Sequence, residues 1–600
     1  MFMTSKNYIW LLYFITLTLA SCNKDDTITV KIAQTPVITL DSETGVYTTK
    51  IGKHLTITPS VEYAENAIYS WIIDGKLVST EPTYSATWTT EGNVYITFRV
   101  ETLSGTAEEE LRVDVSNLAP PVISLLLPSR GLKVVSGTNY IFTPDIQNQD
   151  EDDFQCQWIR NGQVIATGIT YTFNETQLGS YPITVKASNV DGETSKEFTI
   201  EVVQNMPYEV SFETPSYFQT STDRNTFSGS PVYLKPTLEY FDYPNYEWSV
   251  NGELITDQTG SIYKFAPTSA GSYTVKVTVT EGSGTRSPLT RNVTRAAASL
   301  SAQVIVHCFE REQMDNYRAA TASSSQTQNK VYEYTPAPGQ FINELNTAGF
   351  TGNETTQSDA IAYATKRLSN KYYVSLGGFG GYLIVGFDHS IPKTGNTYDF
   401  SIQGNAFDGS SEPGIIWVMQ DINKNGLPDD EWYELKGSET GNENTAQDYA
   451  VTYYRPTGKG MSVQWIDSKG ETGKIDYLQE YHAQNYYYPQ WIKEDTYTLR
   501  GTCLQSRNKL VGNIWKNQSY DWGYADNYGT DRLTGSTVDG SGQQNGFKIS
   551  NAIYLDGSSV NLKYIDFIKV QVGANTKSGP IGELSTEVFS FYDLSIDNQK

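Results

Sequence analysis

The chain has 600 residues, with 68 acidic against 44 basic side chains and a formal net charge of −24. A surface this acidic repels nucleic acid, and no basic cluster interleaved with aromatic residues offsets it, so a nucleic-acid partner is excluded. The length exceeds what one hydrophobic core organises and predicts about four domains. Four cysteines are too few and too widely spaced for a disulfide framework, and four histidines lie too far apart for a helical zinc motif.

The N-terminus, residues 1–21, predicts an export signal. Its apolar run over residues 8–20 is shorter than the ~20 residues that a membrane-spanning helix needs. A leucine, an alanine and a serine then precede Cys22, which is the pattern of a lipobox. We therefore expect cleavage before Cys22, lipidation of that cysteine and a polar tether over residues 22–27. The alternative is an ordinary cleaved signal in which the cysteine is incidental.

Three stretches in the first half of the chain repeat one pattern. Trp71, Trp158 and Trp248 are each followed, after two residues, by an Asp-Gly or Asn-Gly pair. Such pairs supply the positive φ of hairpin turns, and the strands further on alternate apolar and polar residues as half-buried strands do. A spacing of ~90 residues is that of whole β-sandwich domains. The three predicted sandwiches are residues 28–117, 118–204 and 205–295.

These repeats resemble PKD-like, immunoglobulin-type sandwiches over residues 28–293. The resemblance implies that each tryptophan lies in a core between two sheets, and we assign the three domains a spacer role. An alanine- and serine-rich stretch, residues 294–301, predicts a linker. Residues 302–600 lack the tryptophan repeat and predict a larger β-rich, jelly-roll-like domain with a first strand at 302–308 and a short helix near 358–368. The expected fold class is all-β.

The sharpest local motif begins at Asp421 and ends at Trp432. In calcium loops, carboxylate and amide oxygens at the first, third and fifth positions converge on one point, and a glycine at position six allows the sharp turn. The twelfth position is a tryptophan instead of the bidentate glutamate of an EF-hand. We therefore predict a shorter calcium loop, and the alternative is a hairpin with solvated carboxylates. The predicted ligands are Asp421, Asn423, Asn425, Asp429 and Asp430.

Aromatic residues gather around this loop and in two later segments. Exposed rings suit ligand surfaces, although strand alternation buries about half of the rings on any strand. Each ring taken singly therefore fits a core position more often than a ligand contact, but three consecutive tyrosines cannot all face inward on a strand. The candidate ligand-binding residues are Trp417, Trp432, Tyr433, Tyr486, Tyr487, Tyr488, Trp491, Trp522, Tyr524 and Tyr528.

Catalytic patterns do not stand out. The sequence has no serine elbow, zinc signature or Cys/His pair, and the paired carboxylates of a glycosidase cannot be picked out among 68 acidic residues. We therefore expect a binding protein and no enzyme. Calcium is the candidate ion, and no organic cofactor is expected.

Three blocks of the C-terminal half, residues 412–435, 521–527 and 565–588, resemble Bacteroidetes cell-surface proteins that carry PKD-like domains. Among these are the BtuH-like lipoproteins, which are implied to bind cobamides. The polar residues 23–26 also resemble a surface-export tag. The resemblance implies a lipid-anchored outer-membrane protein, facing the extracellular side, that captures a cobamide (cobalamin) for a TonB-dependent transporter. The alternatives are a glycan-binding lipoprotein of a polysaccharide-uptake system and a structural or adhesive surface protein.

Overall fold

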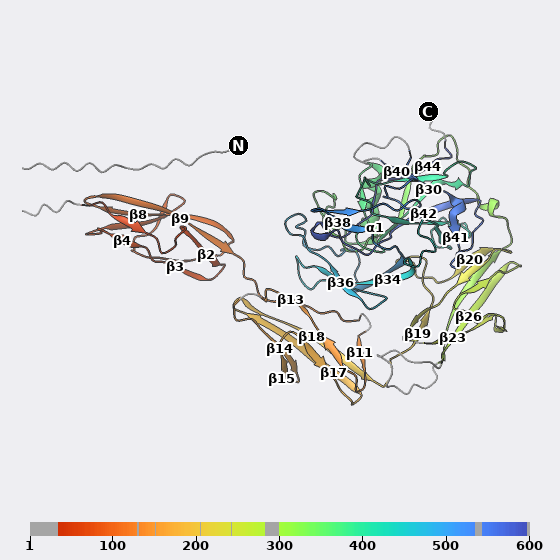
Figure 1. Ribbon diagram of the computed structural model, residues 1–600, viewed down its shortest axis with the longest axis horizontal. Helices are drawn as coiled ribbons and strands as arrows, with labels where there is room; N and C mark the ends of the chain where they lie inside the picture. Colours follow the sequence, from red (N-terminus) through yellow and green to blue (C-terminus); the bar gives the residue numbers. More distant parts are fainter. Residues whose placement is uncertain are drawn as a thin grey trace, which may run out of the picture. The chain divides into compact units, whose positions relative to one another are not determined.

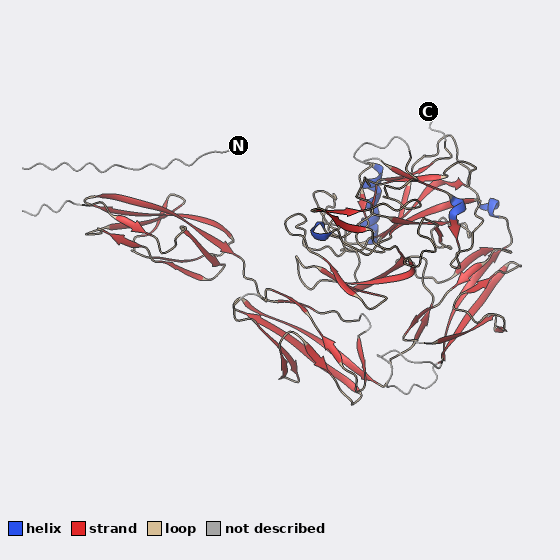
Figure 2. Cartoon of the chain, viewed as in Figure 1, coloured by secondary structure: helices blue, strands red, loops and turns tan. Residues whose placement is uncertain are grey.

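The computed structural model describes residues 34–128, 131–149, 152–204, 206–241, 243–282, 299–533 and 543–596. Strands dominate this part of the chain, as Figure 2 shows. The predicted signal, Cys22 and the tether lie outside it, so those features stay predictions. Among the residues described, no helix has the length and apolar character needed to span a membrane. The chain divides into two compact units, one ending at Ala119 and one beginning at Pro120.

The first unit holds one β-sandwich. Its main sheet contains, in spatial order, β2 (Val46–Lys50), β9 (Gly105–Ser116), β8 (Gly92–Thr102), β5 (Ile68–Ile73) and β6 (Lys76–Ser79). The remaining strands pair as β1 (Val37–Thr39) with β4 (Ser60–Glu62) and β3 (His54–Ile57) with β7 (Tyr84–Thr87). Trp71 is fully buried and donates its indole N–H to the carbonyl of Glu81 at 2.9 Å. The predicted turn is present, with positive φ at Asp74 and Gly75.

The second sandwich repeats this order. Its main sheet contains β11 (Leu132–Val135), β18 (Gly192–Val203), β17 (Gly179–Asn189), β14 (Gln155–Arg160) and β15 (Gln163–Thr167). Its small pairs are β10 (Val122–Ser124) with β13 (Asp145–Gln147) and β12 (Tyr140–Phe142) with β16 (Tyr171–Phe173). Trp158 is fully buried and donates to the carbonyl of Gly168 at 3.0 Å, as expected of a core tryptophan.

The third sandwich has the same arrangement. Its main sheet contains β20 (Arg224–Phe227), β27 (Ser299–Phe309), β26 (Gly271–Glu281), β23 (Pro244–Val250) and β24 (Glu253–Ile255). Its small pairs are β19 (Glu209–Ser211) with β22 (Thr237–Glu239) and β21 (Val232–Leu234) with β25 (Tyr263–Phe265). Trp248 is fully buried and donates to the carbonyl of Gly260 at 3.0 Å. The prediction of three immunoglobulin-like sandwiches is confirmed.

The end of the third sandwich differs from the sequence-based expectation. Strand β27 pairs with β26 from Ser299 to Cys308, so residues 302–308 close the third sandwich instead of opening the C-terminal domain. Val304, Val306 and Cys308 are buried in its core or against it. Their alternation predicted a strand correctly, but alternation does not say which sheet a strand joins. Of the predicted linker, residues 299–301 belong to β27 and residues 294–298 lie outside the described chain.

The C-terminal domain follows β27 and is built from several antiparallel sheets. Its central sheet contains β28 (Lys330–Thr335), β30 (Tyr382–Pro392), β42 (Tyr564–Val572), β32 (Gly414–Met419), β33 (Tyr433–Leu435) and β41 (Ala552–Ile553). A second sheet contains β36 (Thr472–Ile475), β35 (Val463–Asp467), β34 (Ala446–Tyr454) and β37 (Thr496–Cys503). A third contains β40 (Gln544–Phe547), β31 (Phe400–Gln403) and β44 (Ser590–Asp593). The larger β-rich domain is therefore confirmed.

Shorter elements complete this domain. The predicted helix is α1 (Gln357–Ser369), which begins at a capping box between Thr356 and Asp359 and contacts β28. The two-stranded pairs are β29 (Val374–Ser375) with β43 (Glu587–Val588) and β38 (Asn508–Val511) with β39 (Ile514–Asn517). The 3-10 turns are η1 (Gln313–Asn316), η2 (Ile549–Asn551) and η3 (Gly579–Ile581).

The second and third sandwiches both contact the C-terminal domain within the second compact unit (Figure 1). In the second sandwich, the hydroxyl of Ser124 donates to the side-chain oxygen of Gln464 at 2.8 Å. In the third, Arg224 and Glu431 form an ion pair at 3.3 Å. These polar contacts join both sandwiches to the C-terminal domain, and the expected role of the three sandwiches as spacers from the membrane stays a prediction.

Candidate binding site

A cavity of about 360 Å³ lies where the third sandwich meets the C-terminal domain. The sandwich contributes residues 213–217 and Arg224, and the C-terminal domain contributes Trp417, Trp432 and Lys569 among others. Strand register explains part of this arrangement, because Trp417 on β32 lies opposite Lys569 on β42. The volume is within the range of ~300–1,000 Å³ that is usual for small-molecule sites.

Lys569 lies between the two tryptophans. Its Nζ is 4.9 Å from the ring centroid of Trp417 and 4.7 Å from that of Trp432, which are cation–π distances. Burial lowers the pKa of Lys569 to about 8, while the carboxyl groups of Glu333 and Glu434 act in the opposite direction. Among the described residues this Nζ contacts aromatic rings and donates no hydrogen bond. The ammonium group is therefore available to a ligand.

The indole N–H groups of the same tryptophans are also unpaired. Both Nε1 atoms are buried, and neither has an acceptor among the residues that the structure describes. A buried donor without a partner costs about 1–3 kcal/mol. Trp417 and Trp432 also line a second cavity of about 50 Å³, so the two rings stand between the two hollows. A ligand or water that brought acceptors to these rings would remove the cost.

Ion pairs between the sandwich and the C-terminal domain hold the walls of the cavity. Arg224 and Glu431 are only 14% and 16% exposed. Arg500 of the C-terminal domain pairs with Glu213 of the sandwich at 3.4 Å. No sequence pattern indicated Arg224 or Glu213 as wall residues, because each pairs with a residue of another domain. Binding residues were expected only beyond residue 302, but the third sandwich also lines this cavity.

The predicted aromatic residues divide into two groups. Trp417 and Trp432 line the cavity, Trp522 lines a separate hollow with Tyr398, and Tyr486 and Tyr528 are half-buried at other places. Tyr433 belongs to the main hydrophobic core and also lines the smaller cavity beside Trp417 and Trp432. The structure places four further predicted rings in hydrophobic cores: Tyr487, Tyr488, Trp491 and Tyr524.

Two consecutive tyrosines, Tyr487 and Tyr488, are both buried, although a strand would turn one of them outward. The segment has an irregular backbone, so the alternation of a strand does not apply to it. The Tyr487 hydroxyl donates to the carbonyl of His482, and the Tyr488 hydroxyl donates to that of Glu494, each at 2.8 Å. Both hydroxyls are therefore satisfied inside the protein.

The predicted calcium loop closes on itself through hydrogen bonds. The carboxylate of Asp421 accepts from the backbone N–H of Asn425 at 3.1 Å and of Gly426 at 2.9 Å. Asp429 accepts from the side-chain amides of Asn423 at 3.2 Å and Asn425 at 2.7 Å. Four of the five predicted ligands thus lie around one turn. The calcium site itself stays a prediction.

The fifth predicted ligand, Asp430, points to the base of the loop. It accepts from the backbone N–H of Ile422 at 2.6 Å and is almost fully buried. Burial raises the pKa of Asp430 to about 8, although the bond from Ile422 opposes the shift. Asp430 therefore bonds to the base of the loop, and its role as a calcium ligand stays a prediction.

Another carboxyl group cluster was not predicted. Glu412, Asp526 and Glu587 offer oxygens that all lie within 4.8 Å of one another. Burial raises the pKa of each of the three carboxyl groups. Protons can therefore neutralise the cluster without an ion. The three residues are far apart in the chain, so no sequence motif could have revealed it.

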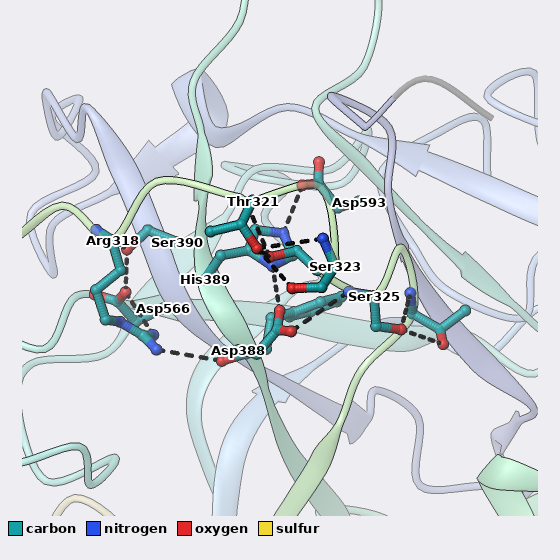
Figure 3. Close-up of polar contacts among 12 residues, drawn as sticks. Arg318, Thr321, Ser323, Ser325, Asp388, His389, Ser390, Asp566 and Asp593 are labelled. Carbon is teal, nitrogen blue, oxygen red and sulfur yellow. Dashed lines mark hydrogen bonds and ion pairs between the residues drawn. The ribbon is translucent and has the colours of Figure 1, made fainter. Parts of the chain in front are cut away.

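A buried histidine forms a further polar network, shown in Figure 3. The imidazole of His389 lies between Asp388, 2.6 Å from its Nδ1, and Asp593, 2.8 Å from its Nε2. Burial alone would lower the pKa of His389, but hydrogen bonds to Asp593 and Asp388 raise it above its ordinary value. The side chain is fully buried, and it joins β30 to β44. We assign it a structural role.

Comparisons with known proteins bear on the sandwiches. A family model described as a PKD-like domain matches residues 35–102 and 120–189, so the first two sandwiches are PKD-like domains. A search of curated proteins found no match.

Similar solved structures include an I-band fragment of titin, I67–I69, at 14% identity and a TM-score of 0.21, covering 46% of this chain and 99% of that chain. The three N-terminal domains of the bacteriophage RB49 outer capsid protein Hoc match at 13% identity and a TM-score of 0.22, covering 46% and 99%. Fibronectin(III)-like modules of Clostridium thermocellum CbhA match at 18% identity and a TM-score of 0.18, covering 28% and 94%. These similarities concern the sandwich fold, and we draw no functional conclusion from them.

Proposed function

We propose that this chain is a cell-surface capture protein that binds a small organic nutrient in the cavity between the third sandwich and the C-terminal domain. One observation carries the proposal: the cavity joins two tryptophans with unpaired indole N–H groups to the unbonded ammonium group of Lys569. Buried donors gain free energy when a ligand supplies acceptors, and the indole rings add apolar contact area.

The leading ligand is a cobamide. Both cavity tryptophans lie in residues 412–435, the block that resembles cobamide-binding lipoproteins. A corrinoid is larger than a cavity of about 360 Å³, so only one edge of it would enter. Its amide arms would accept hydrogen bonds from Lys569 and from the indoles of Trp417 and Trp432.

A glycan is the second candidate, and the cavity size favours it. A hollow of about 360 Å³ has room for a sugar unit. The faces of Trp417 and Trp432 would stack on the sugar ring, and the polar side chains of Gln447 and Asp448 at the cavity wall would bond its hydroxyls. Either ligand would reach a TonB-dependent transporter from a protein anchored through Cys22 on the outer surface.

Calorimetry on the full mature chain tests the proposal. We expect heat on titration with cyanocobalamin, or with an oligosaccharide panel if the second candidate is correct. Trp432→Ala should weaken binding about tenfold or more, and Trp432→Phe, which keeps an aromatic ring but removes the N–H, should weaken it less. Trp522→Ala is the matched control, because that tryptophan lines a different hollow.

The results separate the site from the function. Absence of heat with both ligand classes would overturn the proposed function. Heat that Trp432→Ala leaves unchanged would retain a capture role but reject this cavity. An unchanged melting temperature of the variants shows that they are folded.

A further inference from the structure

The hairpin of β38 and β39 is a two-stranded sheet without a third strand. Its turn contains Gly512, and Val511 pairs with Ile514 at the tip. Its base is fixed to the domain, since the Asn508 amide donates to the Ser578 hydroxyl at 3.0 Å. An isolated two-stranded hairpin is only marginally stable, so this contact at the base helps to keep the hairpin folded against the domain.

The tip of this hairpin is apolar and exposed. Leu510 is 54% exposed, Val511 44% and Ile514 64%. Trp515 is different, because its ring lies against Gly579, where an added Cβ would clash with it. The exposed apolar residues are therefore gathered at the turn of the hairpin, at the opposite end from its base. Apolar groups gathered on a surface mark an interaction site.

A pair of lysines lies behind the tip. Lys509 and Lys516 are directly opposite each other in the hairpin register. Like charges in that position destabilise a hairpin. Neither lysine has an acidic residue opposite it in the hairpin, because each lies opposite the other. Residues 507–518 contain no acidic side chain, in a protein with a net charge of −24.

Strand alternation puts both features on one face. Lys509 and Val511 share a face of β38, and Ile514 and Lys516 share the matching face of β39. Along this face an apolar pair at the tip is followed by a pair of cations. That order matches the boundary of a lipid layer, where apolar side chains enter between acyl chains and lysines meet phosphate groups.

We propose that the β38–β39 hairpin docks on an anionic lipid surface, with Val511 and Ile514 inserted and the two lysines at the headgroup phosphates. The two lysines have no acidic partner within the hairpin, and the phosphate groups of an anionic lipid would supply that counter-charge. The apolar groups are exposed at a narrow hairpin turn, and such a turn enters a fluid layer more readily than it matches a flat protein surface. This docking is independent of ligand capture in the cavity.

Vesicle co-sedimentation tests the proposal. The full mature chain with Cys22→Ala is used, so that no acyl chain can anchor it. We expect binding to vesicles of phosphatidylglycerol and phosphatidylcholine, weak binding to phosphatidylcholine alone, and loss of binding at high salt. Val511→Ser with Ile514→Ser, and Lys509→Glu with Lys516→Glu, should each weaken binding about tenfold or more.

The control is a similar exposed pair elsewhere, Lys76→Glu with Leu77→Ser on β6, which should leave vesicle binding unchanged. Equal binding to both kinds of vesicle would overturn the charge argument. Failure of the chain to bind anionic vesicles, or binding that the hairpin variants do not weaken, would overturn the proposal. Unchanged melting curves of the variants show that exposed substitutions left the fold intact.

Discussion

The first and third sandwiches share one architecture but differ at one strand. β2 and β20 take the same place at the edge of the main sheet, each parallel to the last strand of its domain. No residue of β2 is buried, whereas three of the four residues of β20 are buried. In β20, Arg224 pairs with Glu431 of the C-terminal domain. A repeated domain can therefore keep its core while its edge strand forms a contact with another domain.

The largest expected effect is that of replacing the core tryptophans of the first and third sandwiches. Trp71→Ala and Trp248→Ala should each destabilise their own sandwich by about 3–5 kcal/mol, because both tryptophans are fully buried. Only Trp248→Ala should abolish ligand binding, since the third sandwich forms a wall of the cavity. Scanning calorimetry with ligand titration measures both effects. Binding that survives Trp248→Ala would mean that the third sandwich does not form the site.

The second prediction tests the edge strand itself. Arg224→Ala leaves the carboxylate of Glu431 buried without its partner and should cost about 3–5 kcal/mol in urea unfolding. The control is Arg99→Ala in the first sandwich, whose ion pair with Glu101 is exposed and should contribute under about 0.5 kcal/mol. Glu431→Gln in the Arg224→Ala background should recover much of the loss. If Arg224→Ala and Arg99→Ala lowered the free energy of unfolding equally, the ion pair of the third sandwich would be no more important than that of the first.

The third prediction concerns pH. The folded-state pKa of His389 is raised, so its stabilising contribution is fully present below pH 6.5, the ordinary value, and is lost as pH rises through the folded pKa. The melting temperature of the second unit should therefore fall over that interval, and His389→Gln should flatten the dependence. Melting curves between pH 5 and about 8 provide the measurement. A slope that is unchanged in the variant would contradict the role of this imidazole.

The smallest expected effect is that of calcium. If the loop at Asp421 holds the ion, a chelator should lower the melting temperature of the second unit by a few degrees, and calcium should restore it. Asp421→Asn and Asp429→Asn should remove the response, and the transition of the first sandwich should not move. Identical melting curves with and without chelator would reject a structural calcium.

Local patterns in the sequence determined much of this protein. Period-two alternation, the Asp-Gly and Asn-Gly turns and the core tryptophans predicted three sandwiches, and the segment near residues 358–368 is helical as expected. These features depend on residues close together in the chain, which is why a sequence reveals them. The aromatic residues around the loop at Asp421 also identified Trp417 and Trp432, which line the cavity.

Tertiary structure alone decided the rest. Alternation predicted a strand over residues 302–308, but only the pairing with β26 assigns that strand to the third sandwich. Composition gave equal weight to Trp432 and Tyr488, and only packing put one beside a cavity and the other in the core. No sequence pattern indicated Arg224, because its role depends on an ion pair with a residue of another domain. Contacts between distant parts of the chain form when domains pack together, and no local pattern encodes them.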